Sequence, residues 1–271
     1  MKQPFTIPLI AIAAILLTGC TPSPRPLPSE PHLIQEKAIT FYDNVSADLW
    51  RTEFNEDIYK LADGTVLLTI QDPEGPENVI RAGVDGFREL NNSAQDAVRK
   101  YYEEQGLLYD TPLELNNAYS EYLECKKNGE SYSGRHISQS ISPTASNDKI
   151  ICFFTSVTLP VSGQTSKEIR LGAVFERETG SNINAWDLFS VSQEEAKRFI
   201  LDSFAETSPS LRAEMEAALK PEFIVLFSDN LEVTFPEGTL SSQENGYGTS
   251  LDYDQLKELL HPWAVPDKNK T

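Results

Sequence analysis

The stretch AVFERETGSNINAWDLF, residues 173–189, carries the most information about the fold. Its apolar start predicts a β-strand, and the Thr179-Gly180 pair that follows predicts a turn. Glycine suits a tight turn because it lacks a Cβ atom and readily adopts a positive φ. Asp187 can cap the start of a helical turn, and the two apolar residues after it suit burial. The stretch therefore predicts a strand that reverses at a glycine and leads into a helical region.

The residues before this turn predict a run of strands. Residues 135–142, 148–159 and 168–178 are rich in β-branched and aromatic side chains. The segments between them, PTASN and PVSGQTSK, contain the proline, glycine and small polar residues of turns. Because the connections are short, we expect the three strands to pair in an antiparallel meander.

Further upstream, a hairpin and a helix are predicted. Residues 50–72 contain two strand-like runs around Asp63-Gly64, which is a strong hairpin signal. Residues 92–102 have small and apolar side chains at helical spacing. The residues expected on the inward face of this helix are Ala94, Ala97, Val98 and Tyr101.

The last hundred residues change from strands to helices and back. Residues 190–206 predict a helix that begins with a capping box of Ser192 and Glu195. The elements predicted after it are a second helix over 208–221, a strand pair over 222–235 and a closing helix over 250–262. Strands and helices do not alternate as in βαβ units, so the fold class is α+β, an antiparallel sheet meander with helices packed on it, in one domain or two intimate lobes.

The N-terminus predicts export and a lipid anchor. Residues 7–17 form an apolar run of eleven residues, whereas a spanning helix needs about 20. Residues 17–20, LTGC, resemble a bacterial lipobox, in which the cysteine receives a diacylglycerol and the peptide is cut before it. We therefore expect residues 1–19 to be a lipoprotein signal peptide and Cys20 to be the lipidation site, which places the chain on the extracytoplasmic face of the cell membrane. The alternative is an ordinary secretory signal in which Cys20 is incidental.

The segment after the lipobox predicts a spacer. Residues 20–35 contain prolines at positions 22, 24, 26, 28 and 31. Proline-rich segments favour the extended polyproline II conformation, so this segment forms a semi-rigid tether. The folded part then divides into an N-terminal α+β region over 36–164 and a C-terminal domain over 165–266.

Two cysteines remain besides Cys20, namely Cys125 and Cys152. In an exported protein such a pair can form a disulfide, and the alternative is two separate thiols. No CxxC motif is present, so the sequence does not indicate a redox or zinc site.

The chain is strongly acidic, with a net charge of −18 at pH 7. Removal of residues 1–19 takes away only Lys2, so the mature chain carries 22 basic and 41 acidic residues and a net charge of about −19. Such a chain does not attract nucleic acid through its overall field, whereas opposite charge would speed its encounter with a cationic partner. The alternative role of the charge is solubility on a crowded surface.

Motifs of catalytic sites are absent from the sequence. It contains no HExxH, GxSxG, P-loop, GxGxxG or EF-hand motif, so we expect no metal, no cofactor and no catalytic triad. Pairs of carboxylates could serve a glycan hydrolase, but 41 acidic residues produce such pairs by chance. The pairs considered are Glu103 with Glu104, Glu194 with Glu195, and Asp252 with Asp254.

Aromatic side chains offer a second kind of site, a platform for sugar rings. The candidates are Tyr101, Tyr102, Tyr119, Tyr122 and Tyr247. Tyrosines three residues apart on a helix also pack inward with the hydroxyl at the rim, which is the structural alternative for the first four. Tyr247 lies between two glycines in a loop-like segment, so it is the preferred surface contact for a ligand.

The chain resembles one known family of protein domains. Phe175, Thr179, Gly180 and the run 187–189 match a domain of unknown function in bacterial exported proteins, although Glu176 stands where that family usually has Asp. That domain forms the extracellular part of the anti-sigma factor RsiV and a non-catalytic region of the peptidoglycan deacetylase PdaC. The resemblance covers most of residues 40–262, with more specific matches after 165, and implies an α+β domain of the cell envelope.

Two departures limit what this resemblance implies. RsiV spans the membrane and binds a sigma factor inside, whereas a lipid anchor at Cys20 would leave no inner segment. The family's loop before the closing helix is often apolar, whereas residues 236–250 are polar and glycine-bearing here. The first hypothesis is therefore a non-enzymatic, lipid-anchored binding or sensing module whose ligand is a cell-wall glycan or a cationic wall-active protein such as lysozyme. The alternative is an enzyme that acts on wall glycan through a carboxylate pair.

Overall fold

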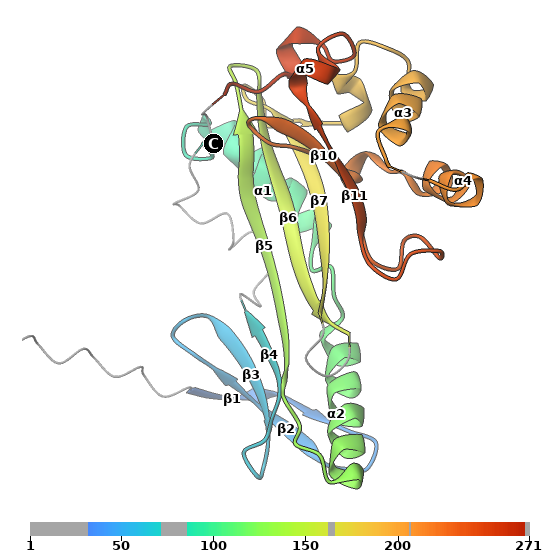
Figure 1. Ribbon diagram of the computed structural model, residues 1–271. Helices are drawn as coiled ribbons and strands as arrows, with labels where there is room; N and C mark the ends of the chain where they lie inside the picture. Colours follow the sequence, from blue (N-terminus) through green and yellow to red (C-terminus); the bar gives the residue numbers. More distant parts are fainter. Residues whose placement is uncertain (1–31, 72–85, 162–165, 206, 269–271) are drawn as a thin grey trace, which may run out of the picture. The chain divides into compact units, whose positions relative to one another are not determined.

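A sheet of eight strands, in the same order as in the sequence, forms the larger part of the fold (Figure 1). The computed structural model describes residues 32–71, 86–161, 166–205 and 207–268, which all belong to one unit, Pro31–Thr271. The strands are β1 (His32–Thr40), β2 (Ser46–Arg51), β3 (Glu56–Leu61), β4 (Val66–Gln71), β5 (Arg135–Ser146), β6 (Ile150–Pro160), β7 (Ser166–Glu176) and β8 (Asn182–Ile183). The predicted lipobox and signal peptide lie outside the described residues.

The predicted α+β class and the meander are confirmed, with one difference in strand direction. Strands β5, β6 and β7 pair antiparallel along their lengths. Strands β4 and β5 are parallel, because the chain between them passes through α1 (Asn92–Gln105) and α2 (Thr111–Asn128) before it returns. The sheet is therefore mixed, although mostly antiparallel.

The turn predicted at PTASN, residues 143–147, begins only at the last residue of that segment. Pro143 belongs to β5, at an irregularity in its pairing with β6. The chain turns instead at Asn147, whose side-chain oxygen accepts hydrogen bonds from the backbone N–H groups of Lys149 and Ile150. A proline is tolerated in this strand because a bulge locally breaks the ladder of hydrogen bonds.

The predicted domain boundaries stay predictions, and they fall at or beside strands of the large sheet. Strands β6 and β7 pair from Ile150 opposite Glu176 to Pro160 opposite Ser166. The boundary predicted between residues 164 and 165 therefore falls between two paired strands of one sheet. Strand β1 begins at His32, so its first residues come from the segment expected to be tether.

A smaller sheet and several short helices follow β8. Its strands are β9 (Ile224–Leu226), β10 (Asn230–Phe235) and β11 (Tyr247–Asp252), in the order β11-β10-β9. The helices are η2 (Ala185–Leu188), α3 (Gln193–Asp202), α4 (Pro209–Ala218), η3 (Pro221–Phe223), α5 (Tyr253–Leu256) and η4 (Pro262–Ala264). The predicted strand pair and the capping box of Asp252 and Gln255 are confirmed, whereas β11 lies where a loop was expected.

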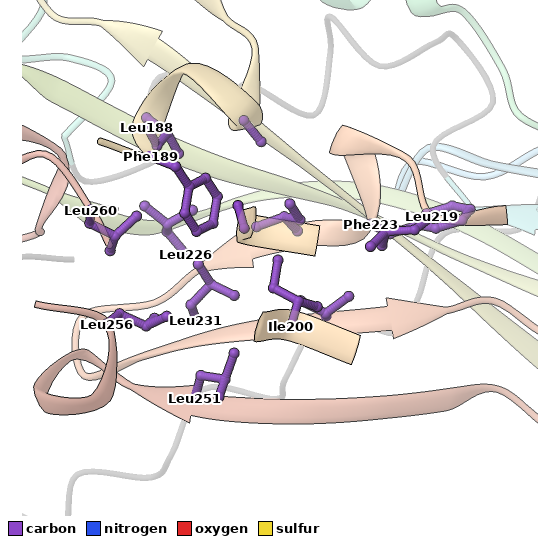
Figure 2. Close-up of a cluster of buried hydrophobic side chains, with 14 of the residues drawn as sticks. Leu188, Phe189, Ile200, Leu219, Phe223, Leu226, Leu231, Leu251, Leu256 and Leu260 are labelled. Carbon is purple, nitrogen blue, oxygen red and sulfur yellow. The ribbon is translucent and has the colours of Figure 1, made fainter. Parts of the chain in front are cut away.

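Three clusters of buried side chains hold these elements together. The C-terminal cluster joins η2, α3, α4 and the small sheet, and Figure 2 shows Leu188, Ile200, Leu226 and Leu251 converging within it. The α1 cluster packs the helix residues Ala94, Val98 and Tyr102 against β5, β6 and β7. The hairpin cluster packs α2 residues Leu115, Ala118 and Tyr119 against the strands β2 to β6.

The two sheets approach each other at Gly172 in β7. A Cβ atom at this position would overlap the backbone carbonyl group of Ile224, the first residue of β9. The absence of a side chain lets β9 and η3 lie directly against β7. The position of the small sheet on the large one therefore depends on a glycine in the strand interior.

Cys125 and Cys152 are separate thiols in the structure. Cys152 is buried in the C-terminal cluster, and its burial raises the pKa of the thiol. Cys125 is half-buried on α2, which packs in the hairpin cluster. Since the two side chains lie in different parts of the fold, the disulfide that the sequence allowed is not formed.

The turn between β7 and β8 gives a test of the packing of α1. Gly180 has φ of 71°, as its place in the predicted turn requires, and a Cβ there would overlap the carbonyl group of Ala94 in α1. Gly129 has a similar φ of 73° but no heavy atom within 4 Å of the same position. We expect Gly180→Ala to lower the free energy of unfolding by about 3 kcal/mol, and Gly129→Ala by only about 1 kcal/mol. Equal losses in denaturant unfolding would contradict the close contact.

Candidate functional site

An open cavity with mixed chemistry lies between α1, β7 and η3. It has a volume of about 470 Å³. We name it the aromatic groove, and its lining residues are Tyr101, Glu104, Gln105, Leu108, Leu171, Lys220, Glu222 and Phe223. It thus combines apolar side chains with two carboxylates, an amide and an amine.

The first wall of the groove comes from the end of α1. Ala94, Val98 and Tyr102 form the buried face of this helix. Tyr101 directly precedes Tyr102 in the helix, so its side chain lies at the margin of that face and is half-buried. Its ring meets Tyr102 and Phe175 edge-on, with ring centroids 5.0 and 5.1 Å apart. These contacts hold the ring of Tyr101 in place before any ligand arrives.

The opposite wall comes from η3. Pro221 begins this short turn, which suits its fixed φ, and Phe223 ends it. Phe223 is buried and packs edge-on against Phe235 of β10, with ring centroids 5.8 Å apart. The ammonium of Lys220 lies 6.0 Å from the centre of the Phe223 ring. The wall is therefore anchored in the small sheet and carries a positive charge at its edge.

The charges of the groove act on Tyr101. Burial raises the pKa of its hydroxyl, and the negative charge of Glu222 raises it further. The hydroxyl therefore stays protonated at neutral pH and can donate a hydrogen bond as well as accept one. Together with the carboxylates of Glu104 and Glu222 and the amide of Gln105, it provides polar groups around an apolar surface.

The carboxyl groups whose pKa is shifted lie outside the lining of the aromatic groove. The carboxyl groups with shifted pKa among the described residues all have lowered values, namely Asp43, Asp63, Glu168 and Glu214. No cluster of His, Cys, Asp and Glu suited to a metal ion occurs in the part of the chain that the structure describes.

The predicted carboxylate pairs lie in three separate places. Glu103 and Glu104 are both exposed, and of the two only Glu104 lines the aromatic groove. Glu194 and Glu195 occupy the first turn of α3, where negative charge is favourable. Asp252 caps α5. Only one of these pairs therefore contributes to the groove, and it does so through one member.

Most of the predicted aromatic platform is used for packing. Tyr102 is fully buried, and Tyr119 stacks on Phe41 with ring centroids 4.0 Å apart. Tyr122 donates a hydrogen bond to Asp63 at 3.3 Å. Only Tyr101 among these four lines the groove.

Tyr247, the preferred contact in the sequence, begins β11 and is half-buried. Its ring lies 5.2 Å from that of Phe204, and its hydroxyl donates a hydrogen bond to the carbonyl oxygen of Ala205 at 2.9 Å. The two glycines beside it do not make a loop here, because Gly248 pairs with Thr234 of β10. Its position is thus at the margin of the C-terminal cluster, and it does not line the groove.

Comparisons with solved structures include two matches to DUF3298 family proteins. The chain matches a DUF3298 family structure from Bacteroides fragilis with 8% identity and a TM-score of 0.43, over 86% of this chain and 92% of that one. It also matches a DUF3298 family protein from Pseudomonas aeruginosa PAO1 with 13% identity and a TM-score of 0.33, over 53% and 70% of the two chains. Both are structures of DUF3298 family proteins, the domain family that residues 173–189 resemble. No protein-family model and no curated protein matches the sequence.

No helix among the described residues has the length and apolar character needed to span a membrane. The lipidation of Cys20, which lies outside those residues, stays a prediction.

Tyr102, directly behind Tyr101, gives a stability prediction. Its buried hydroxyl has no hydrogen-bond partner among the described residues, and burial raises its pKa. Because an unsatisfied buried hydroxyl costs free energy, we expect Tyr102→Phe to raise the free energy of unfolding by about 1 kcal/mol. In the matched variant Tyr119→Phe, loss of the hydrogen bond to Asp43 should lower it by about 1 kcal/mol. A loss of stability in Tyr102→Phe would mean that the hydroxyl has a partner.

The polar loop before β11 gives a pH prediction. The carboxylate of Glu214 accepts hydrogen bonds from the backbone N–H groups and hydroxyls of Ser241 and Ser242. These bonds, with that from the Ser241 hydroxyl first, lower the pKa of Glu214 from its ordinary 4.5. The hydrogen bonds that attach this loop to Glu214 should therefore be fully formed above about pH 4.5. They should be lost as the pH falls through the lowered pKa that Glu214 has in the folded protein.

Amide chemical shifts of Ser241 and Ser242 followed through an acid titration measure this directly. In Glu214→Gln the transition should disappear, because no proton binds there. A transition in the wild-type protein at or above pH 4.5 would contradict the assignment.

Proposed function

We propose that this chain is an extracytoplasmic binding module, anchored to the membrane by a lipid on Cys20, and that the aromatic groove binds a cell-wall glycan. The observation that carries the proposal is the half-buried ring of Tyr101, held by two aromatic neighbours beside polar groups that can bind hydroxyls. The lipobox motif supports the location, because an anchored domain outside the membrane meets wall polymers first.

The chemistry of the groove matches that of a sugar ring. A pyranose has an apolar face of C–H groups and a rim of hydroxyls, so it needs an aromatic surface and hydrogen-bond acceptors at the edge. Tyr101 and Phe223 provide the aromatic groups, and Glu104 and Glu222 provide the acceptors. The volume of about 470 Å³ lies in the range of ordinary small-molecule sites.

Binding of soluble wall fragments to residues 21–271, measured by calorimetry, tests this proposal. We expect Tyr101→Ala to weaken binding at least tenfold, because the variant removes the aromatic surface. Tyr101→Phe should have a smaller effect, since it keeps the ring. The matched control is Tyr42→Ala, because Tyr42 is 78% exposed and does not line the groove. Equal binding by the wild-type protein and Tyr101→Ala would contradict the proposal, as would no binding by either.

The second candidate ligand is a cationic wall-active protein such as lysozyme, which the net charge of −18 favours. In that case the association rate should fall steeply as salt rises from 0.02 to 1 M, because screening shortens the Debye length to about 3 Å, while the dissociation rate changes less. Absence of lysozyme binding at low salt would remove this candidate and leave the glycan.

The alternative of a glycan-cleaving enzyme has one supporting observation, namely that Glu104 and Glu222 both line the groove. Release of reducing ends from wall glycan, abolished in both Glu104→Gln and Glu222→Gln, would favour the enzyme over the binding module.

A further inference from the structure

A second open cavity lies at the C-terminal end of β7, beyond the contact between the two sheets. It has a volume of about 340 Å³, and we name it the Trp263 pocket. Along β7, Gly172 beneath Ile224 and the buried Val174 lie between the aromatic groove and this pocket. None of the described residues lines both cavities, so the pocket is a separate one. Its lining residues are Lys149, Ile150, Glu176, Ile183 and Trp263.

The aliphatic part of the Trp263 pocket is held by strand pairing. Ile150 of β6 lies opposite Glu176 of β7 and is fully buried in the C-terminal cluster. Ile183 of β8 lies opposite Val174 of β7 and is half-buried against the same cluster. Both positions are therefore set before a ligand arrives, and Ile183 offers apolar surface that a ligand can cover.

Trp263 gives the pocket an aromatic wall whose position is set by its neighbours. The ring of His261 stacks on it, with ring centroids 5.6 Å apart and an angle of 14°, so one face of the indole is covered. The side-chain amide of Asn147 donates hydrogen bonds to the carbonyl oxygens of Trp263 and Val265, at 2.9 and 2.8 Å. Trp263 is nevertheless 37% exposed. The part of the ring that His261 leaves open is therefore a fixed surface on which a ligand can pack.

Two opposite charges lie beside this apolar surface. Lys149 comes directly before Ile150, and Glu176 lies opposite Ile150, so both charged side chains are attached at the end of the same strand pair. In the part of the chain that the structure describes, neither side chain forms an ion pair. The carboxylate of Glu176 accepts a hydrogen bond from the hydroxyl of Thr179 at 2.6 Å, which orients it and leaves further acceptor capacity. The pocket thus presents an ammonium and a carboxylate that do not neutralise each other directly.

We infer that the Trp263 pocket binds a free α-amino acid with a large apolar or aromatic side chain. The α-carboxylate of the ligand pairs with Lys149, its α-ammonium pairs with Glu176, and its side chain packs on Trp263 and Ile183. This site is additional to the glycan site proposed in the aromatic groove and does not depend on it.

The ligand class follows from the charges and the size of the pocket. An ammonium and a carboxylate next to one apolar surface complement a zwitterion with an apolar body, and both pairings are charge-assisted hydrogen bonds. A neutral sugar offers no charge to either group. The volume of about 340 Å³ lies at the lower end of the range for small-molecule sites, which suits a single amino acid.

Phenylalanine is the probe, because it carries both charges and an aromatic side chain. Its amide lacks the carboxylate, N-acetylphenylalanine lacks the ammonium, and glycine lacks the side chain. The protein for calorimetry is residues 21–271, which include the whole unit Pro31–Thr271. It should bind phenylalanine, and it should bind each of the other three compounds roughly tenfold more weakly or worse.

Variants of the pocket assign each charge to its partner. Lys149→Gln should weaken the binding of phenylalanine roughly tenfold and have little effect on the amide, which has no carboxylate to pair. Glu176→Gln should weaken phenylalanine in the same way and have little effect on N-acetylphenylalanine, which has no ammonium. Trp263→Ala should weaken all three phenylalanine compounds, and Trp263→Phe should keep part of the affinity. The matched control is Lys257→Gln, at an exposed lysine that does not line the pocket.

The inference has clear contrary outcomes. Absence of phenylalanine binding, or equal affinity for phenylalanine and its two capped derivatives, would overturn it. Tighter binding of the dipeptide alanyl-phenylalanine than of phenylalanine would also overturn it, because the occupant would then be the end of a peptide. Loss of affinity in Trp263→Phe with an unfolding curve like that of the wild-type protein would support it, even where Trp263→Ala fails to fold.

Discussion

The contact of Gly172 with Ile224 is the constraint on which the rest of the C-terminal half depends. Only a residue without Cβ lets the backbone of β9 lie against β7, and this approach sets η3 beside the end of α1. Leu171 and Phe223, on either side of the contact, then face the same cavity. The candidate site is therefore a direct result of how closely two backbones pack.

The second wall of the site is fixed at the other end of β7. The turn after this strand meets α1 at Gly180, which has no room for a side chain. The side chain of Asn91, which caps α1, donates a hydrogen bond to the carbonyl oxygen of Glu178 at 2.7 Å. One strand thus positions both α1 and η3, so a ligand in the groove would contact walls that are already in place. Such preorganisation lowers the entropic cost of binding.

Local patterns predicted much of the fold and little of the site. The Thr179-Gly180 turn, the three-stranded meander and the capping box of Asp252 all depend on neighbours in sequence, and all three are present. The parallel pairing of β4 and β5 depends on the path of two intervening helices, which periodicity does not reveal. Strand β11 was missed because its segment is polar and glycine-rich, and its pairing with β10 overrides those preferences.

The site residues come from elements far apart in the chain, which explains why only one of the five candidate aromatics, Tyr101, lies there. Tyr101 could be noticed as an aromatic at the margin of a helix face. Phe223 gave no such signal, because it lies in a short turn that begins at Pro221 and contributes only through tertiary packing. Tyr247 gave a stronger local signal, yet its hydroxyl is bound to Ala205.

Chemical-shift mapping of the isotope-labelled protein with soluble wall glycan tests the central claim most directly. The account predicts that shifts change in one connected set, at the end of α1, at Leu171 and at η3. Changes confined to the hairpin strands and α2, or no changes at saturating glycan, would contradict it.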